Sequence, residues 1–273
     1  MPLLELQQLA VRFGGLTAVA GLDLVAEEGS LLALIGPNGA GKTTAFNAIT
    51  GVYAPSEGRV RFAGREIGGA RPHAIARLGI ARTFQNIRLF RTLSALENVL
   101  AALAGAERSS FRDVGRGSRW RERERRARER ALELLERLGL ERFAGARADS
   151  LAYGEQRRLE IARALATAPR LLLLDEPAAG MNPSEKRSLR ELVRRLRSEF
   201  RLTIVLIDHD VQFVMDLCDR VAVLDHGEKI ADGPPQAVRR DPKVIEAYLG
   251  RDDAADGSSP APATCDAGSR EHA

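Results

Sequence analysis

The chain has 273 residues, of which 44% are hydrophobic and 29% charged, and its formal net charge is +4 at pH 7. This composition supports a sizeable core and excludes an intrinsically disordered protein. The modest positive charge permits contact with nucleic acid or a membrane surface but requires neither. No signal-peptide pattern or apolar run of ~20 residues is present, and Cys218 and Cys265 resemble ordinary reduced thiols, so we expect a soluble, cytoplasmic protein.

Alternating or clustered apolar residues predict strands in the first third of the chain. The predicted strands cover residues 3–13, 22–26, 30–35, 58–62 and 80–84. A helix is predicted over 44–49, where it ends near Gly51, and a short helix opens at Pro72.

The pattern becomes helical at Ser94, which with Glu97 forms a capping box for a helix running to about residue 104. Residues 107–118 are rich in Gly, Ser and Arg and predict a loop. Residues 119–138 predict a charge-dense helix, whose apolar stripe is Ala127, Ala131, Leu134, Leu135 and Leu138.

The Arg-rich half of this helix has two interpretations, a nucleic-acid-binding arm or a solvated helix with ion pairs four residues apart. The second is favoured, because Glu122–Arg126 and Glu124–Arg128 have the spacing of such pairs.

The second half of the chain alternates apolar strands and helices, which is typical of a parallel sheet covered by helices. Strands are predicted at 171–174, 203–207, 221–224 and 230–231. Helices are predicted at about 157–168, 183–200 and 211–218, and near residues 236 and 244. Residues 251–273 lack periodicity and are expected to form a disordered tail.

The strongest chemical motif is the phosphate-binding loop pattern G-x-x-x-x-G-K-[ST], placed between a predicted strand and a predicted helix. Glycines allow close approach of the main chain to phosphates, Lys42 supplies a positive charge, and the Thr43 hydroxyl can ligate Mg²⁺. Lys42 is one of only four lysines among 41 basic residues, which favours a specific role. The predicted nucleotide-binding residues are Gly36, Pro37, Asn38, Gly39, Ala40, Gly41, Lys42, Thr43 and Thr44.

Two further segments carry chemistry. Asp175 and Glu176 follow a predicted buried strand, where Asp175 can hold Mg²⁺ and Glu176 can activate a water for attack on the γ-phosphate. Gly154, which lies 21 residues before Asp175, opens a predicted helix. That helix start offers a second anion site, although an ordinary capped helix explains it equally well.

In their order and spacing, the phosphate loop, Gln85, residues 151–156, Asp175-Glu176 and His209 resemble the ATP-binding cassette (ABC) ATPases over about residues 3–250. Within that family the chain is most similar to the ATPase subunits of branched-chain amino-acid importers. The segments that carry this closer resemblance are 13–19, 82–86, 151–154, 158–163, 175–183 and 246–250.

The resemblance implies an α/β fold with a P-loop NTPase (RecA-like) core, an N-terminal antiparallel β subdomain and an inserted α-helical subdomain. It implies one ABC ATPase domain over 1–250, with the core at about 1–92 and 157–250 and the helical subdomain at about 93–156.

The resemblance also assigns roles to individual residues. Phe13 would stack on adenine, Gln85 would ligate Mg²⁺ and the attacking water, and His209 would hold the γ-phosphate. The signature segment, which we define as residues 151–155, would contact ATP held by a second subunit; its members are Leu151, Ala152, Tyr153, Gly154 and Glu155. Residues 179–182 would cross the interface between the subunits.

The chain departs from the family pattern at several points. The usual signature reads Leu-Ser-Gly-Gly-Gln, whereas this chain has Ala152, Tyr153 and Glu155 at three of those positions. Ala152 lacks the hydroxyl that would bond the γ-phosphate, so main-chain N–H groups near Gly154 would have to replace it. Asp208 stands before His209 where a longer glutamate is more usual.

The function implied is that of the ATP-binding and ATP-hydrolysing subunit of an importer at the cytoplasmic face of the inner membrane. Its partners would be membrane permease subunits, a second ABC ATPase subunit, identical or related, and indirectly a substrate-binding protein; its ligands would be ATP and Mg²⁺. The alternatives are another ABC system, such as a urea or amide importer or lipopolysaccharide export, and a non-transport ABC protein acting on nucleic acid. No nucleic-acid partner is expected, because the chain has neither a second cassette nor a long coiled-coil insertion.

Overall fold

A computed structural model describes residues 1–106 and 118–249 of the chain. The tail predicted over 251–273, and all but the last residue of the loop predicted over 107–118, lie outside the described residues. Within the described ranges, no helix combines the length and apolarity needed to cross a membrane.

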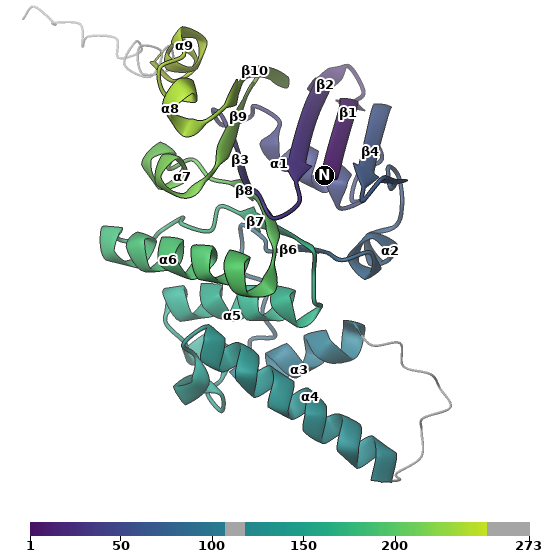
Figure 1. Ribbon diagram of the computed structural model, residues 1–273, viewed down its shortest axis with the longest axis vertical. Helices are drawn as coiled ribbons and strands as arrows, with labels where there is room; N and C mark the ends of the chain where they lie inside the picture. Colours follow the sequence, from purple (N-terminus) through teal and green to yellow (C-terminus); the bar gives the residue numbers. More distant parts are fainter. Residues whose placement is uncertain (107–117, 250–273) are drawn as a thin grey trace, which may run out of the picture.

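The N-terminal part of the chain forms a four-stranded antiparallel sheet in the order β2-β1-β4-β5 (Figure 1). Its strands are β1 (Pro2–Phe13), β2 (Leu16–Glu27), β4 (Glu57–Phe62) and β5 (Arg65–Glu66). β2 begins six residues before its predicted start at 22, because pairing with β1 extends from Glu27 to Leu16 although residues 16–21 carry a weak apolar signal.

A six-stranded sheet in the order β10-β9-β3-β8-β7-β6 forms the centre of the molecule. Its strands are β3 (Leu31–Ile35), β6 (Ile80–Arg82), β7 (Leu171–Asp175), β8 (Thr203–Ile207), β9 (Arg220–Asp225) and β10 (Glu228–Gly233). Neighbours from β9 to β6 pair in parallel, and only β10 is antiparallel. Every residue of β3, β7 and β8 is buried, as the continuous apolar runs predict for strands covered on both faces.

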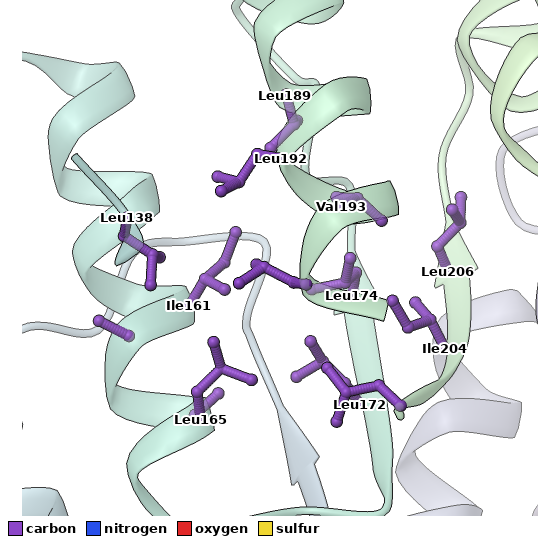
Figure 2. Packing of buried hydrophobic residues seen from close by; sticks show 14 of the residues in the cluster. Leu138, Ile161, Leu165, Leu172, Leu174, Leu189, Leu192, Val193, Ile204 and Leu206 are labelled. Carbon is purple, nitrogen blue, oxygen red and sulfur yellow. The ribbon is translucent and has the colours of Figure 1, made fainter. Parts of the chain in front are cut away.

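The two faces of this sheet pack against different layers, because successive side chains of a strand point to opposite faces. Leu172 and Leu174 of β7 join a core with the helices α5 and α6 (Figure 2). Leu171 and Leu173 join a second core with α1 and the antiparallel sheet. The helices are α1 (Lys42–Ile49), α2 (Pro72–Arg77), α3 (Ala95–Ala106), α4 (Ser118–Arg137), α5 (Tyr153–Ala166), α6 (Pro183–Phe200), α7 (Val211–Leu217), α8 (Pro235–Val238) and α9 (Pro242–Leu249).

The structure confirms the predicted start of α3. The Ser94 N–H and hydroxyl both donate to the Glu97 carboxylate, at 2.7 and 2.8 Å, and the Glu97 N–H donates back to the Ser94 hydroxyl at 3.2 Å. These reciprocal bonds are those of a capping box. The helix packs against both α4 and α5 below the central sheet (Figure 1).

The charge-dense helix α4 is also confirmed. Of the two predicted ion pairs, Glu122–Arg126 forms at 2.8 Å, whereas Glu124–Arg128 does not form in the part of the chain that the structure describes. Instead Arg125 pairs with acidic residues one turn away on either side. The apolar stripe is buried from Ala131 onward. The ion pairs support the interpretation as a solvated helix.

Candidate nucleotide-binding and hydrolysis site

Residues predicted to bind nucleotide and Mg²⁺ or to act in hydrolysis lie at the ends of four parallel strands of the central sheet. Gly36 follows β3, Asp175 ends β7, and His209 lies two residues after β8. Gln85 lies three residues after β6, the strand beside β7. Since parallel strands place their carboxyl ends at the same edge of a sheet, the topology gathers these residues where α/β sheets bind ligands.

The phosphate loop needs glycine at both of its ends. Gly36 has φ 146° and Gly41 has φ 99°. A Cβ at Gly36 would lie 1.9 Å from the carbonyl oxygen of Leu224, and one at Gly41 would lie 2.2 Å from that of Ala18. The loop is therefore pressed against β9 on one side and β2 on the other, at distances that only glycine allows.

Lys42 lies inside this loop. Its ammonium donates to the carbonyl oxygens of Gly36 and Pro37, both at 2.8 Å, and the residue is 8% exposed. α1 begins at Lys42, two residues before its predicted start, so Thr43 and Thr44 belong to its first turn. The helix N-terminus and the ammonium thus lie together at the phosphate loop, an arrangement suited to binding an anion.

The Asp175 carboxylate is held by an arginine that the sequence analysis did not single out. Arg82 pairs with it at 2.7 Å, and both side chains are nearly inaccessible to solvent. The same guanidinium donates to Asn47 of α1 at 2.7 Å and to Thr50, the C-cap residue of α1, at 3.3 Å. In the sequence, Arg82 belongs to the segment 82–86 that carries the resemblance and is the charged residue of the strand predicted over 80–84, but neither observation assigns it a role. β6 in fact ends at Arg82, two residues earlier than predicted.

Glu176, Gln85 and His209 form one cluster. The Gln85 amide nitrogen donates to the Glu176 carboxylate at 2.9 Å, and the His209 Nδ1 lies 3.7 Å from the same oxygen. Glu176 has φ 47°, the left-handed conformation, which strains a non-glycine residue. Its N–H is bonded to the Ile207 carbonyl at 2.8 Å, so the end of β8 holds this conformation.

Asp208, the shorter acid before His209, is fully buried and accepts hydrogen bonds from the N–H groups of Asp210 at 2.9 Å and Ala178 at 3.1 Å. Burial raises the pKa of the Asp208 carboxyl group. The residue thereby ties the turn that carries His209 to the segment after Glu176.

The signature segment lies at the N-terminus of α5. Ala152 is the N-cap residue, and its N–H is bonded by the Glu155 carboxylate at 2.8 Å. Tyr153 is 45% exposed, and a Cβ at Gly180 would lie 3.8 Å from its ring. Leu151 is buried. In the described residues these contacts stay within α5 and its neighbours and do not reach the phosphate loop of the same chain.

Phe13, the predicted adenine-stacking residue, ends β1 and is 43% exposed. Its ring meets Tyr53 edge-on, with 5.0 Å between centroids and an interplanar angle of 77°. The sequence analysis missed Tyr53, because a single tyrosine in the turn before β4 has no motif around it.

Comparison with known proteins defines the class of this chain. Residues 19–179 match the family model described as ABC transporter, and residues 228–254 match that of the branched-chain amino acid ATP-binding cassette transporter. The chain belongs to the ABC transporter family, as the ATP-binding subunit that hydrolyses ATP.

Individual relatives carry more specific names. The chain is 49% identical over 250 residues to the high-affinity branched-chain amino acid transport ATP-binding protein BraF of Pseudomonas aeruginosa, covering 91% of this chain and 98% of the relative. It is 45% identical, with the same coverage, to LivG of Escherichia coli K12. It is 36% identical over 248 residues to the lipopolysaccharide export system ATP-binding protein LptB of Acidithiobacillus ferridurans, covering 91% and 97%.

Solved structures confirm the predicted fold class. A nucleotide-free ATP-binding cassette from an ABC transporter superposes with a TM-score of 0.80 at 31% identity, covering 91% of this chain and 99% of that one. The ADP conformation of MJ1267, another ATP-binding cassette, gives a TM-score of 0.80 at 30% identity, covering 92% and 99%.

Proposed function

We propose that this protein is the ATPase subunit of an importer for branched-chain amino acids. The observation that carries the hydrolytic part is the hydrogen bond between Gln85 and Glu176, at the strand ends that also hold the phosphate loop. The names of the relatives and the match of residues 228–254 support the substrate class.

The phosphate loop, Gly36 to Thr44, binds the phosphates of ATP through main-chain N–H groups and the start of α1. Lys42, now bonded to two loop carbonyls, provides the positive charge for the β- and γ-phosphates. Phe13, with Tyr53 at its edge, provides an aromatic surface for adenine.

The residues around Asp175 fit Mg²⁺, because this ion prefers oxygen ligands. The Thr43 hydroxyl and the Asp175 carboxylate supply such oxygens. The amide nitrogen of Gln85 is taken by Glu176, so its amide oxygen is the atom suited to the cation. When bound, Mg²⁺ neutralises charge on the phosphates. Arg82 holds Asp175 in place from the side of α1.

Glu176 acts as the general base that orients and deprotonates the attacking water, and His209 holds the γ-phosphate. The 3.7 Å approach of His209 to Glu176 supports a shared task. The signature segment contacts the ATP of a second ABC ATPase subunit, which accounts for its separation from the phosphate loop of its own chain. Residues 179–182 lie at that interface.

The docking surface for the permease is a pocket lined by residues next to Gln85 and at the start of α5. Its lining includes Asn86, Ile87, Leu89, Arg91 and Tyr153. A permease segment bound in this pocket touches the loop that carries Gln85. Movement of that segment therefore shifts Gln85, which is bonded to Glu176. The protein is then held at the cytoplasmic face of the membrane by its permease partners, and a substrate-binding protein delivers the amino acid.

The hydrolysis site is tested by two substitutions in the purified chain. Glu176→Gln should abolish ATP turnover while ATP binding and an ATP-dependent dimer persist, because only the base is lost. Lys42→Ala should weaken ATP binding itself. Glu191→Gln and Lys243→Ala, on exposed residues, are the matched controls. Wild-type turnover in Glu176→Gln, or unchanged ATP affinity in Lys42→Ala, would contradict the assignment.

The transport role is tested by co-purification. A tagged chain isolated from its own cells should bring membrane permease subunits and a second ABC ATPase with it, and deleting its gene should reduce leucine uptake. Tight DNA binding at physiological salt without any permease would instead favour the nucleic-acid alternative. The pairing of Arg125 and Arg126 with glutamates on α4 argues against that alternative.

A further inference from the structure

The loop that carries Gln85 leaves the sheet without main-chain partners from a neighbouring strand. The Thr83 N–H still bonds to the Leu173 carbonyl at 2.9 Å, and after it the chain departs from β7. The main-chain groups of this loop bond to other partners instead, and those partners determine where Gln85 lies.

Those partners are charged side chains on one stripe of α5. Glu160 accepts the N–H of Phe84 at 3.1 Å and that of Arg88 at 3.5 Å, while Arg157 donates to the Phe84 carbonyl at 2.7 Å. Arg163, six residues after Arg157, donates to the Arg88 carbonyl. The loop is thus bonded to α5 by side chains where a strand would be bonded by main chain.

Arg157 is the centre of this arrangement. The residue is fully buried at 0% exposure, and its NH1 pairs with Glu160 at 2.8 Å. Its NH2 faces the Gln85 carbonyl at 3.1 Å, the Tyr153 hydroxyl at 3.3 Å and the Glu176 carbonyl at 3.4 Å. NH2 has two hydrogens and three acceptors, so the two longer contacts, to the Tyr153 hydroxyl and the Glu176 carbonyl, share one hydrogen.

The contacts of Arg157 join the two residues whose side chains meet in the hydrolysis site. Gln85 and Glu176 are bonded to one another through their side chains, and their carbonyl oxygens both face the same guanidinium. We infer that Arg157, fixed by Glu160, is a positioning residue that sets the geometry of Gln85 and Glu176 for ATP hydrolysis. This inference rests on the role proposed above for Glu176.

Arginine is suited to this task and lysine is not. A guanidinium presents its donors in a rigid planar fork, so one side chain can bond two loops at fixed angles. An ammonium is a single nitrogen on a flexible stem and cannot hold both loops in the same geometry. Arg157→Lys therefore keeps the buried charge while removing the fork.

The main test is steady-state ATP hydrolysis by Arg157→Lys in the full chain. Because a small misplacement of reacting groups has a large effect on rate, we expect kcat to fall by about 10- to 100-fold. KM for ATP should stay within about twofold, since Arg157 does not touch the phosphate loop and reaches the signature segment through the Tyr153 hydroxyl alone, by a long bond of 3.3 Å. Arg158→Lys, the same change one residue later and beside Gly139, should leave both constants near wild type.

A second measurement separates positioning from general stability. Hydrogen exchange of the Phe84 and Arg88 amides should accelerate in Arg157→Lys, because a single ammonium cannot hold the Glu160 carboxylate and the loop carbonyls in their present geometry together. Amides within β7 and β8 should keep wild-type exchange. Exchange that rises equally throughout the chain would show a purely structural role and overturn the inference.

The remaining outcomes are also decisive. Wild-type kcat in a folded Arg157→Lys, or a change in KM alone, would overturn the inference. If that variant does not fold, Glu160→Gln decides in its place, with a fall in kcat at constant KM expected. If neither variant folds, the pair is a folding element and the inference is wrong. Glu176→Gln, measured in the same assay, distinguishes failure of this inference from failure of the proposed function. Wild-type turnover in Glu176→Gln refutes the proposed hydrolysis site. An inactive Glu176→Gln together with a fully active Arg157→Lys refutes only the role of Arg157.

Discussion

Replacing Gly36 by alanine tests how tightly the phosphate loop is pressed against the sheet. The new Cβ would lie 1.9 Å from the Leu224 carbonyl oxygen, and this contact must open to at least 3.0 Å. Leu224 lies in β9, which is paired with β3 on one side and β10 on the other, so the carbonyl cannot retreat without disturbing the sheet. The loop itself must therefore move.

Two effects should destabilise the Gly36→Ala variant. A non-glycine residue at φ 146° is strained by about 1–3 kcal/mol, and forcing an extra methyl group against the sheet adds about 1–3 kcal/mol. Together these effects should reduce the free energy of unfolding by about 4 kcal/mol. For a chain of this size, each kcal/mol lowers Tm by about 3 °C, so we expect Tm to fall by about 12 °C. Gly39→Ala is the matched control: its φ is 81° but nothing lies within 4 Å of the new Cβ, so we expect a loss of about 1 kcal/mol and about 3 °C.

The assay is thermal unfolding of both variants without nucleotide, followed by ATP binding at a temperature where both are folded. Gly36→Ala should also bind ATP more weakly, because its loop has moved. If Gly36→Ala were as stable as Gly39→Ala, the close approach of the loop to β9 would be wrong.

Three further predictions concern the rest of the fold. Ser94→Ala removes the side-chain cap of α3 and should reduce the free energy of unfolding by about 1 kcal/mol in urea titration, with Ser94→Asp retaining most of it; equal stability of the two variants would contradict the cap. Leu206→Ala, at a fully buried site between β7 and β3, should lose about 3 kcal/mol, whereas Leu132→Ala on the exposed side of α4 should lose less than about 0.5 kcal/mol; similar losses would refute the packing. Burial raises the pKa of the Cys218 thiol, so in a Cys265→Ser chain maleimide should label Cys218 slowly when the chain is folded and rapidly in denaturant; rapid labelling of the folded chain would contradict the burial. Because the unfolded thiol ionises at lower pH than the folded one, the contribution of this thiol to stability is fully present below the ordinary thiol pKa and is lost as pH rises above it.

The sequence by itself determined the elements whose signals are local. The apolar run of residues 203–207 predicted β8, and Pro183 to Phe200 predicted α6, both with the bounds found in the structure. The patterns that predict the phosphate loop and the acidic pair at 175–176 are also local, because close approach of main chain to phosphate requires glycine, and the proposed catalytic carboxylate directly follows its strand. Boundaries such as those of β2 and β6 were missed, since pairing with a neighbouring strand decides where a ladder begins and ends.

Only the tertiary structure decided which side chains hold the site together. Arg82 meets Asp175 across 93 residues, and Arg157 meets the Phe84 carbonyl across 73. In sequence these arginines are two among many, because what distinguishes them is burial beside particular oxygens. A sequence motif identifies residues that face a ligand. A side chain that supports those residues can be identified only when the packed sheet and α5 bring distant parts of the chain into contact.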